Sequence, residues 1–86
     1  MRVLIPSALR SYTGERTWVE ADGATLAELL SELDHHYPGI RFRMVDEQQR
    51  IRRHIRVFCR GRQLPSVDAA LEGADEVLIV QALSGG

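Results

Sequence analysis

Apolar and polar residues alternate along three stretches of the chain: residues 2–6, 16–21 and 54–60. This period of two is typical of β-strands that bury one face. A fourth stretch, residues 77–83, is almost continuously apolar, as expected for a central strand. We expect the first two strands to form a hairpin around a long loop that turns at residues 11–14. A short return strand is expected at Gln63-Leu64, before Pro65.

An amphipathic helix is predicted to begin after Thr25. The Thr25 and Glu28 side chains fit a capping box, in which each accepts a hydrogen bond from the backbone N–H of the other residue. Apolar residues at spacings of three and four then form one stripe: Leu26, Leu29, Leu30, Leu33 and Tyr37. Pro38-Gly39 is expected to end this helix.

Two further segments are expected to be mostly irregular. Residues 40–53 are charged and weakly periodic, which predicts a loop with room for one helical turn. Asp68 to Leu71 predicts a single helical turn. The order strand, strand, helix, strand, short strand, strand indicates an α+β fold, with one main helix on one face of a mixed sheet of four or five strands. With 86 residues, we expect one domain over residues 1–83 and a flexible tail at residues 84–86.

The composition is that of an ordinary globular domain. Hydrophobic residues make up 44% and charged residues 27% of the chain, which argues against disorder. No apolar run approaches the roughly 20 residues of a membrane span, and no signal-peptide pattern opens the chain. We therefore expect a cytoplasmic protein that contacts no membrane. The lone Cys59 excludes an internal disulfide, and its alternation with Ile55 and Val57 places it on the core face.

The usual patterns of catalytic and binding residues are not found. The sequence has no paired acids, no Ser/His/Asp or Cys/His arrangement and no glycine-rich phosphate loop. His35 and His36 are adjacent on the helix, so they point about 100° apart and do not chelate one ion. His54 is expected to be a solvated residue at the start of a strand. We expect no catalytic residue, no metal site and no permanently bound cofactor.

The basic residues have an unusual composition and distribution. All 11 are arginine, and lysine is absent. Codon preference of a GC-rich genome explains this most simply, while a surface without side-chain amines to acylate is the alternative. Six arginines crowd into one segment: Arg50, Arg52, Arg53, Arg56, Arg60 and Arg62. They fit either a solvated loop and sheet edge, or docking to an acidic partner or nucleic acid. A net charge of −1 gives no global field for nucleic acid, which we therefore do not expect as a partner.

The chain ends in Ser84-Gly85-Gly86, directly after its most apolar strand. Glycine has no Cβ, so such an end can thread a narrow channel, and three extended residues reach about 10 Å. A carboxylate is a poor electrophile, but coupling to AMP makes it a mixed anhydride with a good leaving group. This end fits the substrate of an ATP-using enzyme, although Gly-Gly alone also fits a terminus without function.

Together these features resemble the MoaD/ThiS family of ubiquitin-like sulfur carriers. The resemblance covers the whole chain and rests on the following segments: Gly23 to Leu30 at the helix entry, Asp34 to Gly39 at the helix end, and Ala74-Asp75-Glu76-Val77 leading to Ser84-Gly85-Gly86. It implies a β-grasp fold. It also implies that the chain is a protein substrate and not an enzyme.

The resemblance further implies a set of partners. An adenylyltransferase of the ubiquitin-activating type would use ATP to adenylate Gly86. A sulfur donor would then convert the carboxylate to a thiocarboxylate, and an acceptor such as a synthase large subunit would receive the sulfur. Gly85 and Ser84 would complete the flexible end that passes the partner's channel.

Family members meet their partners through the outer face of the sheet, beside the tail. Counting back by twos, Val77 and Ile79 should face the helix. The outer face then carries the expected partner surface, an apolar patch with a basic rim: Phe58, Leu78 and Val80, with Arg56 and Arg60. Inverted strand faces would place the apolar members of this patch in the core instead.

The acceptor pathway stays open between the cysteine, molybdopterin and thiamine types. The loop before the last strand is Gly73-Ala74-Asp75 where the family usually has Asp-Gly-Asp, and prolines typical of molybdopterin-type members are missing from Gln81-Ala82-Leu83. The additional loop at residues 40–53 and the opening at residues 5–14 favour the cysteine type. Two alternatives remain: a ubiquitin-like modifier joined to protein amines, and a β-grasp binding module that uses the arginine-rich segment.

Overall fold

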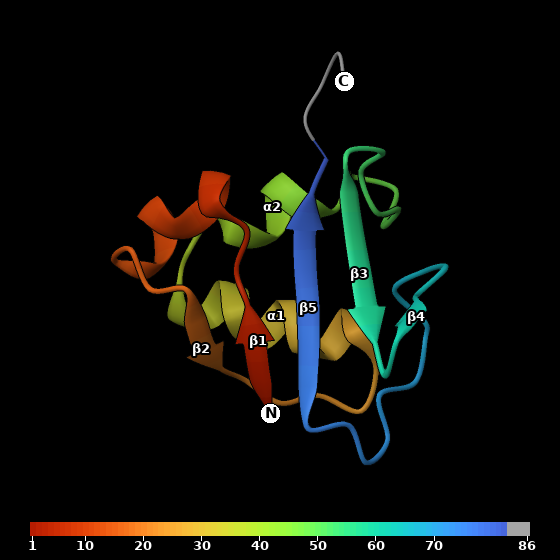
Figure 1. The fold of residues 1–86 in the computed structure, drawn as a ribbon. Coiled ribbons are helices and arrows are strands. Elements are labelled where there is room, and N and C mark those ends of the chain that lie inside the picture. The colour runs from red at the N-terminus through yellow and green to blue at the C-terminus, as the bar shows by residue number, and fades with distance from the viewer. Residues whose placement is uncertain (83–86) are drawn as a thin grey trace.

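The structure, a computed structural model, describes residues 1–82. Its elements follow the chain in this order: β1 Arg2–Leu4, the 3-10 helix η1 Ser7–Thr13, β2 Trp18–Glu20, α1 Leu26–His36, α2 Ile40–Met44, β3 Ile55–Cys59, β4 Arg62–Gln63 and β5 Glu76–Gln81 (Figure 1). They form one five-stranded sheet with the order β2-β1-β5-β3-β4. β1 pairs parallel with β5, and the other pairs are antiparallel. The predicted α+β architecture and the central place of the last strand are confirmed.

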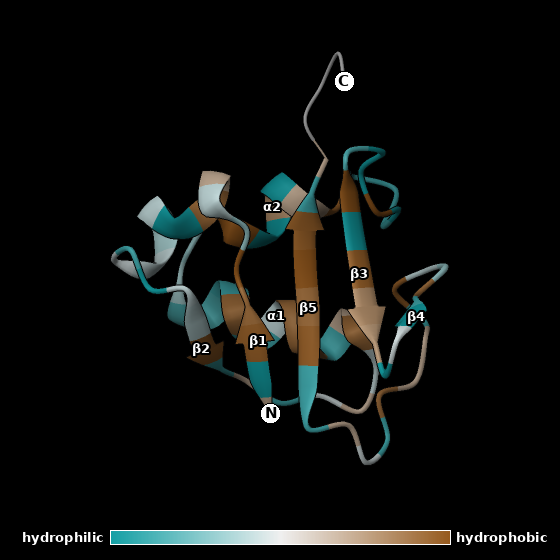
Figure 2. Ribbon diagram, in the orientation of Figure 1, coloured by the Kyte–Doolittle hydropathy of each residue, from teal (hydrophilic) through white to brown (hydrophobic). Residues whose placement is uncertain are grey.

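Helices cover one face of this sheet, and Figure 1 views the other face. The four predicted leucines of α1 are all buried against the sheet: Leu26, Leu29, Leu30 and Leu33. They pack on the inward residues of the strands, such as Val3, Val57 and Ile79, in one core. The hydropathy colouring shows β1 hydrophilic at its first residue and apolar after it, and β5 apolar between its hydrophilic first and last residues (Figure 2). Within residues 1–82, no helix is long and apolar enough to cross a membrane.

The capping box at the start of α1 is confirmed on one side only. The Thr25 hydroxyl accepts from the Glu28 N–H at 3.3 Å, as predicted. The Glu28 carboxylate accepts from the N–H of Ala24 at 3.0 Å, not from that of Thr25. Thr25 itself lies in an isolated antiparallel bridge with Ala70, so the helix entry is held against residues 69–71. The single helical turn predicted from Asp68 to Leu71 is therefore wrong, because this segment is extended where it pairs with Thr25.

The predicted hairpin of β1 and β2 forms, but its connection is more ordered than a long loop. Pro6 has no N–H to continue the ladder, and η1 follows it directly. Leu9 and Thr13 of η1 are buried. The sequence predicted only a turn at residues 11–14 and not this helix, because seven residues of a 3-10 helix give little periodic pattern.

The segment predicted as a charged loop contributes to the core. α2 spans Ile40–Met44, and both its end residues are buried, as is Val45. The Asp34 carboxylate accepts from the backbone N–H groups of Gly39 and Arg41, at 3.0 and 3.1 Å, and thereby holds the entry of α2. Three buried apolar side chains and the partly buried Ile51 are all that anchor this charged run, which is why periodicity alone indicated an irregular loop.

β3 and β4 are joined by a two-residue turn at Arg60-Gly61. Both residues have positive φ angles, 55° and 78°, as a tight hairpin of this kind requires. The return strand covers Arg62–Gln63, one residue earlier than predicted. Leu64 still donates its N–H to Val57 O at 2.8 Å. The turn places Arg60 outside β3, at the end of the sheet where β5 begins.

Candidate functional site

The last described residues are fixed to the middle of the sheet. Ile55 lies opposite Gln81, and the Ala82 N–H donates to His54 O at 2.8 Å. Residues 83–86 therefore follow from the end of β5 that lies beside the start of β3. The predicted tail residues Ser84, Gly85 and Gly86 lie outside the described residues, so their roles stay predictions.

The predicted strand faces are confirmed. Val77 and Ile79 are fully buried against the helix side, and Ile55, Val57 and Cys59 are buried on β3. The three apolar members of the predicted patch lie on the opposite face and are half-buried: Phe58, Leu78 and Val80. Inverted faces are thus excluded, and the buried Cys59 thiol is part of the core.

The outer face also carries two apolar side chains that the sequence-based patch lacked. Leu78 lies between Phe58 on β3 and Leu4 on β1, and Leu4 lies opposite Trp18 on β2. These four residues, which we call the apolar row, cross four strands at one level. Trp18 is 37% exposed, and the Arg2 guanidinium lies 4.1 Å from its ring centroid. The alternation within residues 2–6 and 16–21 is the signal that could have indicated Leu4 and Trp18, but the sequence analysis did not use it, because the pairing of β1 with β5 was missing.

The two arginines predicted as a rim lie at opposite ends of the outer face. Arg56 is half-buried opposite Val80, near the end of β5. Its guanidinium donates to the backbone carbonyls of Arg53 and Ile55. Arg60 lies in the β3–β4 turn and donates to Glu72 O. Arg60 lines a hollow of about 390 Å³, and Phe58 and Leu78 also line this hollow.

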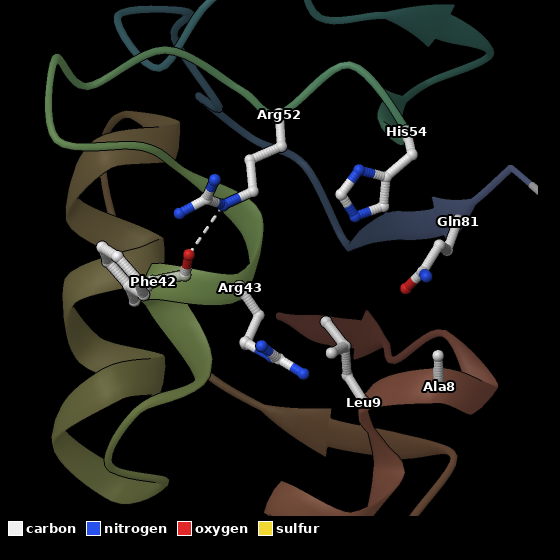
Figure 3. A pocket seen from close by; sticks show the side chains of 7 residues that line it. All are labelled: Ala8, Leu9, Phe42, Arg43, Arg52, His54 and Gln81. Carbon is white, nitrogen blue, oxygen red and sulfur yellow. Dashed lines mark hydrogen bonds between the residues drawn. The ribbon is translucent and has the colours of Figure 1, made fainter. Parts of the chain in front are cut away.

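A second hollow, which we call the tail-base cavity, lies where β5 ends. Its volume is about 370 Å³, and its lining comes from four separate segments: Ala8, Leu9, Phe42, Arg43, Arg52, His54 and Gln81. In Figure 3 the Arg43 side chain extends toward Leu9, and the His54 and Gln81 side chains enter the same space from the other side. The Arg52 Nε donates to Phe42 O at 2.8 Å, and its guanidinium lies 4.8 Å from the exposed Phe42 ring.

Sequence reasoning did not find this cavity, because it depends on η1 and α2 meeting the end of β5. It also misplaced His54. That residue was expected at a solvated strand edge, but it is half-buried and precedes a strand that is paired on both sides. Among residues 1–82, no group of three or more His, Cys, Asp or Glu side chains is placed to hold a metal ion.

Comparison with known proteins identifies the family. A family model described as the ThiS family matches residues 3–86. The chain belongs to the ThiS family. The resemblance deduced from the helix entry and the Gly-Gly end is thereby confirmed.

Individual relatives of this ThiS-family chain agree with the assignment. It is 30% identical to the sulfur carrier protein CysO of Mycobacterium tuberculosis over 89 residues, which cover 98% of this chain and 96% of that protein. It is 26% identical to small archaeal modifier protein 3 of Haloferax volcanii, over 93% of this chain and 91% of that protein.

The fold agrees as well. A chain in the crystal structure of the Amycolatopsis orientalis BexX/CysO complex superposes with a TM-score of 0.89 and 32% identity, covering 99% of this chain and 98% of that one. The ubiquitin-like β-grasp fold is confirmed.

Proposed function

We propose that this chain is a sulfur carrier whose Gly86 carboxylate is adenylated and then converted to a thiocarboxylate. The family match carries this proposal, because it runs through Ser84-Gly85-Gly86 to the last residue. The similarity to a protein named sulfur carrier over almost its whole length supports it. The chain acts as a substrate of partner enzymes, and ATP belongs to the enzyme that activates it.

The chemistry needs two steps at Gly86. A carboxylate oxygen attacks the α-phosphorus of ATP, pyrophosphate leaves, and an acyl-adenylate forms. A sulfur nucleophile at the oxidation level of sulfide then attacks the carbonyl carbon, and AMP leaves with the carboxylate oxygen that it bonded. The product is a thiocarboxylate, which an acceptor enzyme uses as a source of sulfur.

The fold supplies a rigid base for this end of the chain. β5 is hydrogen-bonded to β1 on one side and β3 on the other, and Ala82 is still bonded to His54. A partner that binds the apolar row therefore binds a face on which β5 is fixed up to its last residue. We propose that Phe58, Leu78 and Val80, extended by Leu4 and Trp18, form the docking face, with Arg56 near the end of β5.

We infer that the acceptor belongs to cysteine biosynthesis. The 30% identity to CysO covers both chains almost completely, and the 0.89 TM-score comes from a BexX/CysO complex. Both agree with the additional segment at residues 40–53, which the structure describes as α2 and an ordered loop.

A ubiquitin-like modifier is the second candidate, because small archaeal modifier protein 3 is 26% identical. A modifier shares the adenylation step and differs in the product, since an amine of another protein would attack in place of sulfur. The chain lacks lysine, so one copy offers no side-chain amine to another. Mass spectrometry of lysine adducts that end in the Gly85-Gly86 remnant distinguishes the two products.

Adenylation by the host's activating enzyme tests the proposal. We expect the full-length untagged chain to support ATP–pyrophosphate exchange. A chain extended by one alanine after Gly86 should fold equally well and support none, whereas an Ala82→Ser control should behave as wild type. Exchange with the extended chain would contradict a reaction at the Gly86 carboxylate.

A further inference from the structure

The arginines of this chain are unevenly distributed in space. Residues 40–56 hold six arginines and two carboxylates, a formal charge of +4. Because the whole chain has a net charge of −1, the remaining residues carry −5. The positive segment comprises α2, the following loop and the start of β3, which lie at the end of the sheet where β5 ends (Figure 1).

Residues of this positive segment line the tail-base cavity. Arg43, Arg52 and His54 line it, and none of its seven lining residues is acidic. The hollow at the opposite end of β5 is different, because Arg60 there is balanced by Asp75 and Glu76. The positive surface also continues past Arg52 to a smaller hollow of about 160 Å³ that Arg53 and Arg56 line.

Two of these guanidinium groups, those of Arg52 and Arg56, are held in place without an ion pair, whereas Arg43 is exposed and its guanidinium makes no hydrogen bond within residues 1–82. Arg52 and Arg56 donate to backbone carbonyls, at Phe42 O and at Arg53 O and Ile55 O. Within residues 1–82, no carboxylate lies within ion-pair distance of Arg43, Arg52 or Arg56. A fixed guanidinium without a counter-charge binds a carboxylate at a small cost in side-chain entropy.

The cavity also has apolar lining residues on two sides. Phe42 is 58% exposed and lies on the side of Arg52, and Leu9 and Ala8 lie across from it (Figure 3). Gln81, the last residue of β5, forms another part of the lining. Whatever fills this cavity therefore touches the residue at which β5 ends.

We infer that the tail-base cavity receives an acidic segment of the activating enzyme, with a carboxylate against Arg43 and an apolar side chain against Phe42. This inference rests on the proposed function, because that function supplies the enzyme. The positive charge suits a carboxylate or a phosphate, and the position beside the end of β5 favours a protein segment over nucleic acid. Phe42 is the only Phe, Tyr or Trp in the lining, whereas single-stranded nucleic acid needs several stacking platforms.

Steady-state adenylation kinetics with a charge-reversal pair test this inference. Arg43→Glu places a negative charge in the cavity, and Arg62→Glu makes the same change of net charge on β4, away from it. We expect Arg43→Glu to raise the KM for the carrier at least about tenfold. The kcat should stay within about twofold of wild type, and Arg62→Glu should change neither constant by more than about twofold. Arg43→Gln should give an intermediate KM, which keeps the test valid if the reversal disturbs folding.

Ionic strength supplies a second readout. The KM of the wild type should rise with added salt, and that of Arg43→Glu should rise less or fall, because attraction has become repulsion. Equal KM values for Arg43→Glu and Arg62→Glu would overturn the inference while leaving adenylation intact. Loss of oligonucleotide binding by Arg43→Glu, with an unchanged KM, would also overturn it and assign the cavity to nucleic acid. A wild type that supports no exchange would overturn both the proposed function and this inference.

Discussion

At the scale of one residue, the packing around Gly23 explains why the helix entry contains a glycine. A Cβ built on Gly23 would lie 2.4 Å from Leu29 N and 2.9 Å from the backbone carbon of Glu28. These are backbone atoms of α1, so they cannot move aside as a flexible side chain would. The glycine that contributed to the family resemblance is thus required by a close approach of two backbone segments.

We expect Gly23→Ala to lower the free energy of unfolding by about 1–3 kcal/mol, because the helix entry must shift. Gly14→Ala is a suitable control: its Cβ meets nothing within 4 Å, and only its φ of +64° is unfavourable. That control should lose about 1 kcal/mol. Urea unfolding measures both variants, and equal stability of Gly23→Ala and the wild type would contradict the close approach.

Phe58 allows the proposed docking face to be separated from the core. It is half-buried on the outer face, directly between Leu78 and Gln63. We expect Phe58→Glu to raise the KM for the activating enzyme at least about tenfold, with a loss of stability below about 2 kcal/mol. Gln63 lies opposite Phe58 on β4 and supplies the control, because Gln63→Glu should leave the KM nearly unchanged. A Phe58→Glu chain that unfolds would mean that this side chain belongs to the core.

At the scale of elements, the loop between α2 and β3 is held by one carboxylate. Asp46 Oδ1 accepts from the N–H groups of Arg50 and Gln48, at 3.0 and 2.9 Å. The hydrogen bond from the Arg50 N–H, together with that from Gln48 and the charges of Arg50 and Arg52, holds the pKa of Asp46 below its ordinary value of 3.8. This loop carries Arg52 and His54 of the tail-base cavity, so its order matters for the surface they form.

The lowered pKa predicts how the loop responds to pH. A carboxyl group whose pKa is lower in the folded state stabilises the fold above its unfolded pKa, and this contribution is lost as the pH falls through the folded pKa. We therefore expect Asp46→Ala to be less stable than wild type at neutral pH, with a difference that shrinks below pH 3.8. Glu47→Ala is the exposed neighbouring control. A difference that does not depend on pH would contradict the role of the charged carboxylate.

The sequence pattern correctly predicted those elements that depend on interactions between residues close together in the chain. The Thr25 cap, the leucine stripe of α1, the β1–β2 hairpin and the faces of β3 and β5 follow from residues close together in sequence. η1 and α2 were missed or underestimated, because they are short and anchored by few apolar side chains. The bridge between Thr25 and Ala70 replaced a predicted helical turn, and such a long-range pairing leaves no periodic trace.

At the scale of the whole molecule, residues 1–82 form a five-stranded sheet with a buried core of their own, whereas the proposed reacting group is on Gly86. The apolar row and the tail-base cavity both depend on β5 lying between β1 and β3. Neither surface was fully predictable, because the pattern of each strand says nothing about its neighbours in the sheet.

This separation predicts that the tail can be removed without loss of the fold. We expect a chain ending at Ala82 to unfold within about 1 kcal/mol of the full chain and to support no adenylation. Ile79→Ala, which leaves the tail intact but opens a cavity in the core, should lose about 2–5 kcal/mol. Thermal and urea unfolding give the stabilities. An unfolded truncated chain would show that the final residues are part of the structure.

The central claim is that Gly86 carries sulfur, and the intact mass of the untagged protein tests it most directly. The protein is incubated with ATP, sulfide and the host's activating enzyme, and its mass is measured before and after. We predict that the mass increases by the difference between one sulfur and one oxygen atom. Fragmentation should locate this increase at Gly86, and it should be absent without ATP. A chain that is adenylated but keeps a plain carboxylate, or that gains its mass elsewhere, would contradict the claim.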